Sequence, residues 1–276
     1  MIDGSNLLFQ MFFGMPARIV NGSGKAIQGT MGFVGALLKI IRMTEPTHIA
    51  VLFDGEYENE RTALNADYKA NRIDYSELPE EQCPFTQLSD IYNALDYLKI
   101  KHAETTVCET DDWIAGYALT YGKDFQIIIS SFDSDYFQLI TEKISVLRYR
   151  GLKTLICTPE YIINNLGILP AQYADFKSLV GDASDNIRGA DKIGPKTASQ
   201  LLKKFNTLEN IILNAEIIES KHIRESIVRN TERLQTNYKL IKLIGDAQLP
   251  FAIDELKLED VQSTTREVLN GIGLLP

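Results

Sequence analysis

Acidic residues follow several predicted elements of this 276-residue chain, where their carboxylates could act together. Asp133 and Asp135 come directly after residues 125–129, an apolar and β-branched run that predicts a buried strand. Ligands of open α/β sheets bind at the edge where such strands end. Alone, an Asp-x-Asp after a strand is more often a helix cap than a site. The prediction of a site therefore depends on the other acids of the chain.

Nine acidic residues share this kind of position, at the end or the start of a predicted element. They are Asp3, Asp54, Glu109, Asp111, Asp112, Asp133, Asp135, Asp182 and Asp185. If the strands are parallel, their ends lie along one edge and these side chains can converge. For any single residue, an Asp-Gly turn, a helix cap or a solvated surface acid is the better interpretation. For the whole set it is not, because every element would have to end in an acid independently.

Converged carboxylates need cations. Two like charges ~4 Å apart repel by about 4 kcal/mol at an effective dielectric constant near 20. Several such pairs would exceed the stability of a whole domain, which is roughly 5–15 kcal/mol. Oxygen-only ligands suit Mg²⁺ or Mn²⁺. So many acids suggest a pair of ions, an arrangement that stabilises both the attacking and the leaving oxygen in phosphodiester cleavage.

The elements that position these acids alternate between strands and helices. Strands are predicted for residues 48–55, 100–103, 125–129, 144–148 and 154–157. Apolar residues near a 3.6-residue period predict helices for residues 7–13, 30–42, 87–98 and 113–121. Residues 1–4 leave room for only a short first strand, unless the true start lies upstream. The alternation predicts an α/β fold with a mostly parallel central sheet flanked by helices. We expect a catalytic domain over 1–158 and, over 159–276, a region that is helical to its end.

Composition narrows the class of protein. Apolar content of 45% indicates a globular protein with a substantial core, and no run approaches the ~20 residues of a membrane span. The three cysteines form no C-x-x-C and the three histidines are scattered, which argues against a disulfide framework and a zinc site. No secretory signal is visible, so a cytoplasmic protein is expected. A net charge of −9 argues against nucleic acid only if the charge is evenly spread.

Seven short motifs carry a family resemblance. They are Asp3-Gly4, Phe53-Asp54, Asp67-Tyr68-Lys69-Ala70-Asn71-Arg72, Glu109-Thr110-Asp111-Asp112, Asp133-Ser134-Asp135, Gly181-Asp182-Ala183-Ser184-Asp185-Asn186 and Ile193-Gly194-Pro195-Lys196-Thr197-Ala198. In this order they resemble the flap-endonuclease-like 5′ nucleases, specifically the 5′→3′ exonuclease domain of bacterial DNA polymerase I and its free-standing bacterial relatives. The resemblance runs from residue 1 to about residue 213.

The resemblance implies two metal sites with Mg²⁺, or Mn²⁺, as the ions. The first would be held by Asp3, Asp54, Glu109, Asp111, Asp112 and Asp133. The second would be associated with Asp135, Asp182 and Asp185. It also makes residues 56–84 part of a helical arch around a single-stranded 5′ end. Lys69 and Arg72, one helical turn apart, would then face the scissile phosphate, and Tyr68 would stack on a base. The alternative for these three residues is an ordinary exposed helix face.

Residues 185–205 resemble a helix-hairpin-helix that binds DNA phosphates. The implied DNA-binding residues are Lys192, Gly194, Lys196, Thr197, Lys203 and Lys204. A K⁺ ion would be held by the backbone carbonyls of Leu179, Val180, Arg188, Ala190 and Ile193. Three residues depart from the family pattern: Gln10 replaces an Arg, Arg188 a Pro and Lys192 a Gly. The alternative is a Gly-Pro helix start with solvated lysines.

The expected function is a metal-dependent 5′→3′ exonuclease and 5′-flap endonuclease that acts as a monomer in bacterial DNA replication or repair. Hydrolysis would leave 5′-phosphate and 3′-hydroxyl ends. Expected substrates are DNA with 5′ flaps, 5′ ends or single-strand/duplex junctions, with RNA primers as a further class. Two alternatives stay open. A non-catalytic protein that binds branched DNA would need the hairpin but no acids, and a PIN-like ribonuclease would need the acids but no hairpin.

Overall fold

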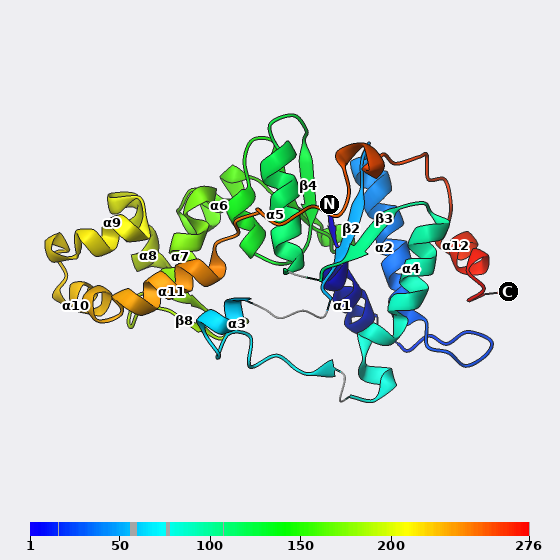
Figure 1. Cartoon of the computed structure of the whole chain (residues 1–276), viewed down its shortest axis with the longest axis horizontal. Helices are drawn as coiled ribbons and strands as arrows, with labels where there is room; N and C mark the ends of the chain where they lie inside the picture. Colours follow the sequence, from blue (N-terminus) through cyan, green and yellow to red (C-terminus); the bar gives the residue numbers. More distant parts are fainter. Residues whose placement is uncertain (16, 56–59, 76–77, 107, 276) are drawn as a thin grey trace.

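The computed structural model describes residues 1–15, 17–55, 60–75, 78–106 and 108–275. Its centre is a six-stranded sheet in the order β3-β2-β1-β4-β5-β6 (Figure 1). The strands are β1 (Ile2–Asp3), β2 (Ala50–Phe53), β3 (Lys101–Glu104), β4 (Ile127–Ser130), β5 (Ile144–Arg148) and β6 (Leu155–Cys157). Neighbouring strands run parallel except β5 and β6, which are antiparallel. The predicted mostly parallel sheet is confirmed.

The two-residue strand β1 lies in the middle of this sheet. Ile2 pairs with Val51 of β2 on one side and with Ser130 of β4 on the other. The short first strand expected from the sequence is therefore present. Because β1 ends at Asp3, this carboxylate leaves the sheet at its centre, between the ends of β2 and β4.

Helices cover both faces of the sheet. α1 (Gly4–Gly14), α2 (Gln28–Thr44) and α4 (Leu88–Tyr97) pack with Val51 and Phe53 on one face. α5 (Thr110–Tyr121) packs with Ala50 and Leu52 on the other. Successive strand side chains point to opposite faces. All four residues of β2 are buried, because each face is covered.

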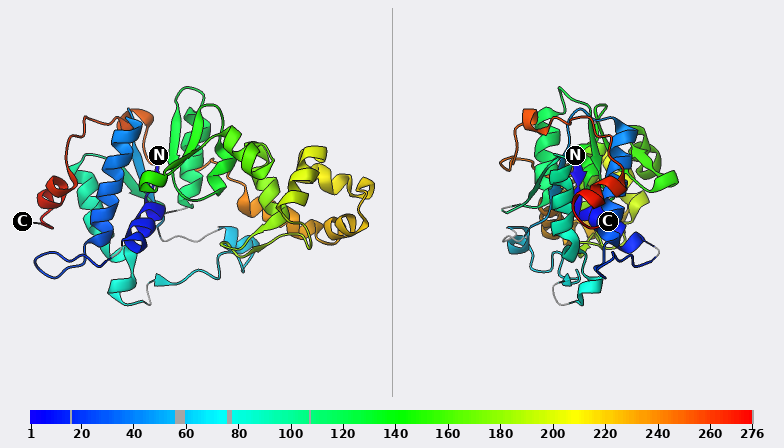
Figure 2. Two further views of the ribbon diagram at one scale, coloured as in Figure 1. Left: turned by 180° about the vertical axis from the view of Figure 1, so that it is seen from behind. Right: turned by 90° about the vertical axis from the view of Figure 1, so that its right-hand side faces the viewer.

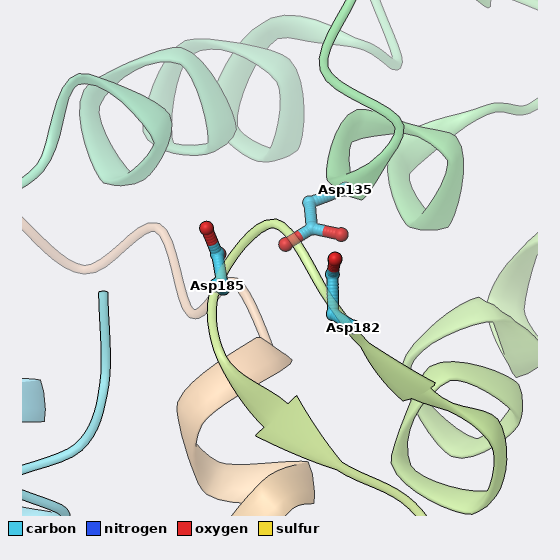
Figure 3. Close-up of side chains that lie close together, drawn as sticks. All are labelled: Asp135, Asp182 and Asp185. Carbon is cyan, nitrogen blue, oxygen red and sulfur yellow. The ribbon is translucent and has the colours of Figure 1, made fainter. Parts of the chain in front are cut away.

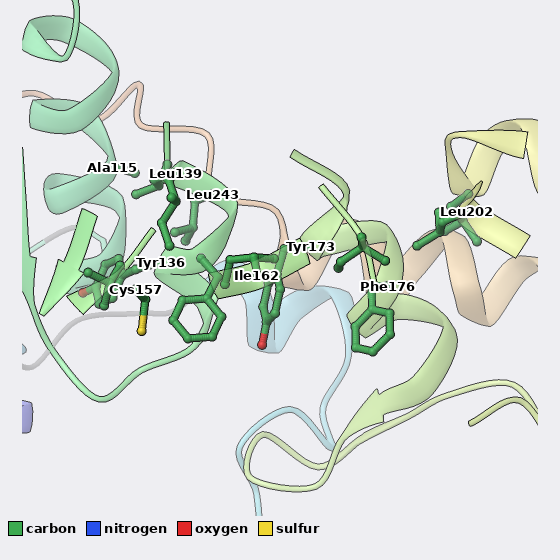
Figure 4. Packing of buried hydrophobic residues seen from close by; sticks show 14 of the residues in the cluster. Ala115, Tyr136, Leu139, Cys157, Ile162, Tyr173, Phe176, Leu202 and Leu243 are labelled. Atoms are coloured by element: carbon green, nitrogen blue, oxygen red, sulfur yellow. The ribbon is translucent and has the colours of Figure 1, made fainter. Parts of the chain in front are cut away.

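The chain beyond β6 forms a row of helices beside the sheet. These are α6 (Pro159–Leu166), α7 (Tyr173–Val180), α8 (Pro195–Phe205), α9 (Leu208–Leu213), α10 (Lys221–Arg229) and α11 (Thr231–Ile241). Tyr136, Ile162, Tyr173 and Phe176 belong to one buried cluster that continues from the sheet into these helices (Figure 4). The helices therefore share a core with the sheet. The division into domains at residues 158 and 159 stays a prediction.

The expectation that this region is helical to its end is wrong in two places. β7 (Gly181–Asp182) and β8 (Ile187–Arg188) form an antiparallel hairpin directly after α7. Gly181 has a φ of 85°, a left-handed conformation at which an α-helix ends. Residues 242–264, all of them described, contain a 3-10 turn at Ile253–Leu256 and a single β-bridge from Lys257 to His48 before α12 (Thr265–Gly271).

Residues 242–264 form a return segment that leads from the helices back to the sheet (Figure 2). The backbone N–H of Leu258 donates to the carbonyl of Thr47 at 2.9 Å. Arg42 Nη2 donates to the carbonyl of Ser263 at 2.9 Å, and α12 then packs on α2 and α4. The chain therefore crosses twice between the sheet and the helices. In the described part of the chain, no helix has the length and apolar character to cross a membrane.

Of the stretch predicted as an arch, residues 56–84, the described residues 60–75 and 78–84 pass below the sheet in Figure 1. Its residues 56–59 and 76–77 lie outside the described residues. The described part forms α3 (Glu60–Leu64), a series of turns as far as residue 72 and a 3-10 turn at Glu80–Gln82. Lys69 has a φ of 57°, so it does not share an α-helical turn with Arg72 as expected.

Candidate active site at the carboxyl edge of the sheet

Asp3 ends β1, and Asp54 directly follows the neighbouring strand β2. Asp3 is buried and also caps α1, because its Oδ1 accepts the backbone N–H of Asn6 at 2.9 Å. Asp54 is exposed, and its Oδ1 accepts the backbone N–H of Thr110 at 3.1 Å. This bond joins the end of β2 to the start of α5. It places the acids of the first turn of α5, Asp111 and Asp112, at the same edge.

Tyr136 and Ser131 connect the acids of different elements. The Tyr136 hydroxyl donates to Asp111 Oδ1 at 2.6 Å and lies 3.4 Å from Asp3 Oδ2. Ser131 Oγ donates to the same Asp3 oxygen at 2.8 Å. Sequence reasoning gave neither residue a role. The available signal was their position, since both stand in the stretch that follows β4.

Three further acids gather beside this group. Oxygens of Asp135, Asp182 and Asp185 lie within 4.8 Å of one another, and Figure 3 shows the side chains facing one another. Asp135 follows β4, whereas Asp182 and Asp185 come from the β7–β8 hairpin. Asp133 links the two groups, because its Oδ1 accepts the backbone N–H of Asp135 at 2.8 Å. The second acid group of the sequence analysis is therefore brought together in space.

The electrostatics of these acids fit a bound cation. Burial, and then the charge of Asp54, raise the pKa of Asp3 to about 7. Burial and the charge of Asp133 raise the pKa of Asp135 to about 8. Asp135 Oδ1 is buried and has no hydrogen-bond partner among the residues that the structure describes. A buried acceptor of this kind is costly unless something binds it, and hard divalent cations prefer carboxylate oxygens.

Basic side chains of residues 61–72 reach down onto the acids. Lys69 Nζ lies 2.7 Å from Glu109 Oε1. Burial alone would lower the pKa of Lys69, but Glu109 and Asp111 raise it above its ordinary value. Arg72 Nη2 lies 2.9 Å from Asp185 Oδ1. The two cations predicted to face the phosphate therefore contact predicted metal ligands.

Two other cations of the site escaped the sequence analysis as site residues. Arg61 pairs with Glu109, and its Nη2 lies 2.8 Å from Asp112 Oδ1. Lys177 of α7 pairs with Asp182. Arg61 could have been found as the first basic residue of the predicted arch. Lys177 had no such signal, because its helix reads as ordinary packing.

Tyr68 does not lie as expected. Its side chain is only 4% exposed and packs with Ala174, Ile187 and Leu240. Its hydroxyl is 3.3 Å from Glu109 Oε2. The ring is therefore unavailable for stacking on a base, contrary to the sequence expectation, because the apolar face of the helical region covers it.

The predicted DNA-binding residues lie on the loop before α8 and on α8 itself. Gly194 caps this helix and Pro195 occupies its first turn, which leaves backbone N–H groups at an exposed helix start. The lysines of the set, Lys192, Lys196, Lys203 and Lys204, are exposed, and Thr197 is half-buried. None of the six residues belongs to the acidic edge.

The carbonyls predicted to hold K⁺ surround the same loop. The carbonyl of Leu179 accepts the N–H of Ala190 at 2.8 Å, and that of Ala190 accepts the N–H of Ile193 at 3.2 Å. The carbonyl of Arg188 accepts Asn237 Nδ2 at 2.9 Å. The carbonyl of Val180 belongs to the last residue of α7.

Gln10 stands where the family pattern has an arginine. Its Nε2 donates to the carbonyl of Tyr149 at 2.6 Å, so this side chain joins α1 to the residue after β5.

Comparison with known proteins gives a consistent set of relatives. Residues 1–167 match the family described as 5′-3′ exonuclease, N-terminal resolvase-like domain, and residues 168–264 match its C-terminal SAM fold. A 5′-3′ exonuclease of Aquifex aeolicus is 32% identical over 94% of this chain and 86% of its own length. DNA polymerase I of Streptococcus pneumoniae is 33% identical over 98% of this chain. The chain spans only 30% of that polymerase.

Solved structures show the same fold. T5 5′-exonuclease with bound zinc ions superposes with a TM-score of 0.73 at 22% identity, covering 88% of each chain. A T5 flap endonuclease complexed with DNA and metal ions gives a TM-score of 0.71 at 23% identity, again over 88% of each chain. At these identities the likeness concerns the fold alone.

Proposed function

Since this chain belongs to the 5′-3′ exonuclease family, we propose that it is a metal-dependent nuclease that hydrolyses DNA phosphodiester bonds from the 5′ side. The observation that carries the proposal is the meeting of acids from β1, β2, α5, β4 and the β7–β8 hairpin at one edge. Within it, Asp135 Oδ1 is buried and unpartnered among the described residues. A fold that only bound DNA would not need carboxyl groups gathered in this way.

The acids would hold two divalent ions, with Mg²⁺ as the expected ion and Mn²⁺ as a substitute. One ion would be held by Asp3, Asp54, Glu109, Asp111, Asp112 and Asp133, and the other by Asp135, Asp182 and Asp185. Such a pair, when bound, stabilises the attacking and the leaving oxygen of an in-line displacement. Side chains of the protein position the acids and stabilise the charge that develops on the phosphate.

Tyr136 and Ser131 hold Asp3 and Asp111 in place, so these acids keep their positions through a turnover. Lys69 and Arg72 occupy Glu109 and Asp185 in this structure. When cations neutralise those acids, the two side chains can turn to the phosphate and stabilise the charge that develops there. Attack of water on phosphorus breaks the bond to the 3′ oxygen. The products are a 5′-phosphate and a 3′-hydroxyl.

The proposed substrates are DNA with 5′ flaps, recessed 5′ ends or single-strand/duplex junctions, and RNA primers on DNA as a further class. Support comes from the exposed start of α8, where backbone N–H groups can bind duplex phosphates without reading bases. The proposed enzyme is a monomer of DNA replication or repair. Its arch, residues 56–84, would admit the single strand.

Incubation of a 5′-flap duplex, labelled at both ends, with Mg²⁺ tests this function. We expect cleavage near the junction and shortening from the 5′ end, with product lengths that distinguish the two activities. The proposal fails if the protein cleaves no more than an Asp133→Ala control. Binding without turnover in any divalent ion would favour a branched-DNA-binding protein. Preference for an RNA flap over the matched DNA flap would favour a ribonuclease.

A further inference from the structure

The loop between β8 and α8, residues 189–194, is fastened by side chains of α10 and α11. Arg233 Nη2 donates to the carbonyl of Gly189 at 2.8 Å. Ser226 Oγ donates to the carbonyl of Asp191 at 2.6 Å. This loop precedes the exposed start of α8, so its shape decides where the backbone N–H groups of Gly194 and the first turn point.

Asn237 of α11 joins the end of β8, where the loop begins, to α7. Its side chain is 2% exposed, and its amide nitrogen donates to the carbonyls of Ser178 in α7 and Arg188 in β8, at 3.1 and 2.9 Å. A side-chain amide has two N–H donors, and both are used here. Together, Asn237, Arg233 and Ser226 supply protein donors to the carbonyls of residues 188, 189 and 191.

Positive charge is already present at this loop. Arg188 Nη2 lies 2.7 Å from Asp191 Oδ1, and Arg233 Nη2 lies 4.0 Å from the same oxygen. One carboxylate thus faces two guanidinium groups, which leaves one positive charge in excess. Lys192 of the loop adds another, on a residue whose φ of 63° is left-handed. A further cation among these carbonyls would be repelled.

Three of the five carbonyls that the resemblance assigns to K⁺ are already engaged within the protein. Those of Leu179, Arg188 and Ala190 each accept a hydrogen bond from a protein donor. Carbonyls that hold an ion in place of water must direct lone pairs at it. A hydrogen bond from a protein donor takes one of the two lone pairs of each carbonyl. The Arg233 guanidinium donates to the carbonyl of Gly189, the residue between Arg188 and Ala190, so it brings a positive charge to this part of the loop.

We infer that Arg233 and Asn237 hold this loop in the role that the resemblance gives to K⁺, so that DNA binding by the loop does not depend on a monovalent cation. The inference rests on the proposed function for its DNA ligand. Arg233 is a positioning residue, because it acts on phosphate binding through the backbone of the loop.

The test compares cations at equal ionic strength. Binding of a fluorescent 5′-flap duplex is measured in Ca²⁺ with KCl, NaCl or LiCl, and the melting temperature of the free protein is measured in the same salts. The wild-type dissociation constant should change less than about twofold between Li⁺ and K⁺. Arg233→Gln should lose about tenfold in LiCl, the scale of one charge-assisted hydrogen bond, and recover part of this in KCl. Arg233→Lys should keep the wild-type behaviour in part.

Arg229→Gln is the matched control, because it removes the same charge from an exposed arginine of α10. It should respond equally to all three salts. A wild-type protein that binds DNA at least fivefold more tightly in K⁺ than in Li⁺, or an Arg233→Gln protein without cation dependence, overturns the inference. Absence of DNA binding in every salt would instead count against the proposed function. In that case the melting temperatures of the free proteins test the inference. A rise specific to K⁺ in the wild type overturns it. A rise specific to K⁺ that occurs only in Arg233→Gln supports it.

Discussion

At the scale of single residues, uncharged and cationic side chains hold the acids of the site in position. Tyr136 is fully buried, yet its hydroxyl joins Asp111 of α5 to Asp3 of β1. Lys177 brings a positive charge to the group of Asp135, Asp182 and Asp185. Each of these two contacts leads to a separate prediction.

Tyr136→Phe removes only the hydroxyl and keeps the buried ring. Asp111 then loses a hydrogen-bond donor, which should cost about 1–2 kcal/mol and lower the melting temperature by roughly 2–8 °C. Cleavage of a 5′ flap at saturating Mg²⁺ should also fall, because Asp111 is no longer held. The control is Tyr161→Phe, at a half-buried tyrosine of α6. Equal melting temperatures for Tyr136→Phe and wild type would contradict this role of the hydroxyl.

Lys177→Met removes a cation that competes for Asp182. We expect Mn²⁺ to bind about five- to tenfold more tightly, since one nearby positive charge no longer opposes it. The metal-free protein should at the same time be less stable, because its acids repel one another more strongly. Isothermal titration with Mn²⁺ measures the affinity, and the exposed Lys196→Met serves as control. Unchanged or weaker Mn²⁺ binding would show that Lys177 does not compete.

At the scale of elements, the β7–β8 hairpin is what carries Asp182 and Asp185 to the sheet edge. Its ends are packed backbone against backbone. A Cβ atom added at Gly189 would lie 2.4 Å from the carbonyl oxygen of Leu179 and from the carbonyl carbon of Val180. Neither neighbour is a side-chain end that could move aside. The close approach of these two backbones therefore fixes the hairpin on the end of α7.

Gly189→Ala should displace the hairpin. Overpacking against backbone costs about 1–3 kcal/mol or more, and it should weaken metal binding at Asp135, Asp182 and Asp185 as well. Gly22→Ala is the control, because a Cβ atom there meets nothing within 4 Å. Urea unfolding and Mn²⁺ titration of both variants make the comparison. A Gly189→Ala protein as stable as Gly22→Ala would show that the contact is not restrictive.

At the scale of the whole molecule, the buried acids link stability to pH. The raised pKa values of Asp3 and Asp135 mean that the metal-free folded state holds protons which the unfolded state releases near pH 4. This contribution to stability is complete below pH 4 and is lost as pH rises through about 7 and 8. Bound Mg²⁺ would replace those protons.

In EDTA, the melting temperature should fall by several degrees between pH 5 and pH 9. Mg²⁺ should raise it more at pH 8 than at pH 5, where protons compete for the acids. Scanning calorimetry across this range makes the measurement. Asp96→Asn, which neutralises an exposed acid at the end of α4, should follow the wild-type curve. A metal-free melting temperature that rises with pH over this interval would contradict the assignment.

Most of the sheet and the positions of the acids could be predicted from the sequence, because both depend on local patterns. The run at residues 144–148 is β5 itself, and Asp3 and Asp54 stand at strand ends that short apolar runs reveal. The misses involve contacts between distant parts of the chain. Tyr68 is buried only because α7, β8 and α11 cover it, and the return segment is held by partners some 200 residues away. No local pattern of hydrophobicity encodes such partners.

The double crossing between sheet and helices, together with the shared core, bears on the distance between the loop before α8 and the acidic edge. The chain passes twice between the sheet and the helices, and a shared apolar core joins them, so the loop before α8 and the acidic edge are tied together at several points. The span from a clamped duplex phosphate to the point of scission would then be a constant of the molecule. The enzyme would then cut every flap at the same distance from the duplex junction, whatever the length of the flap.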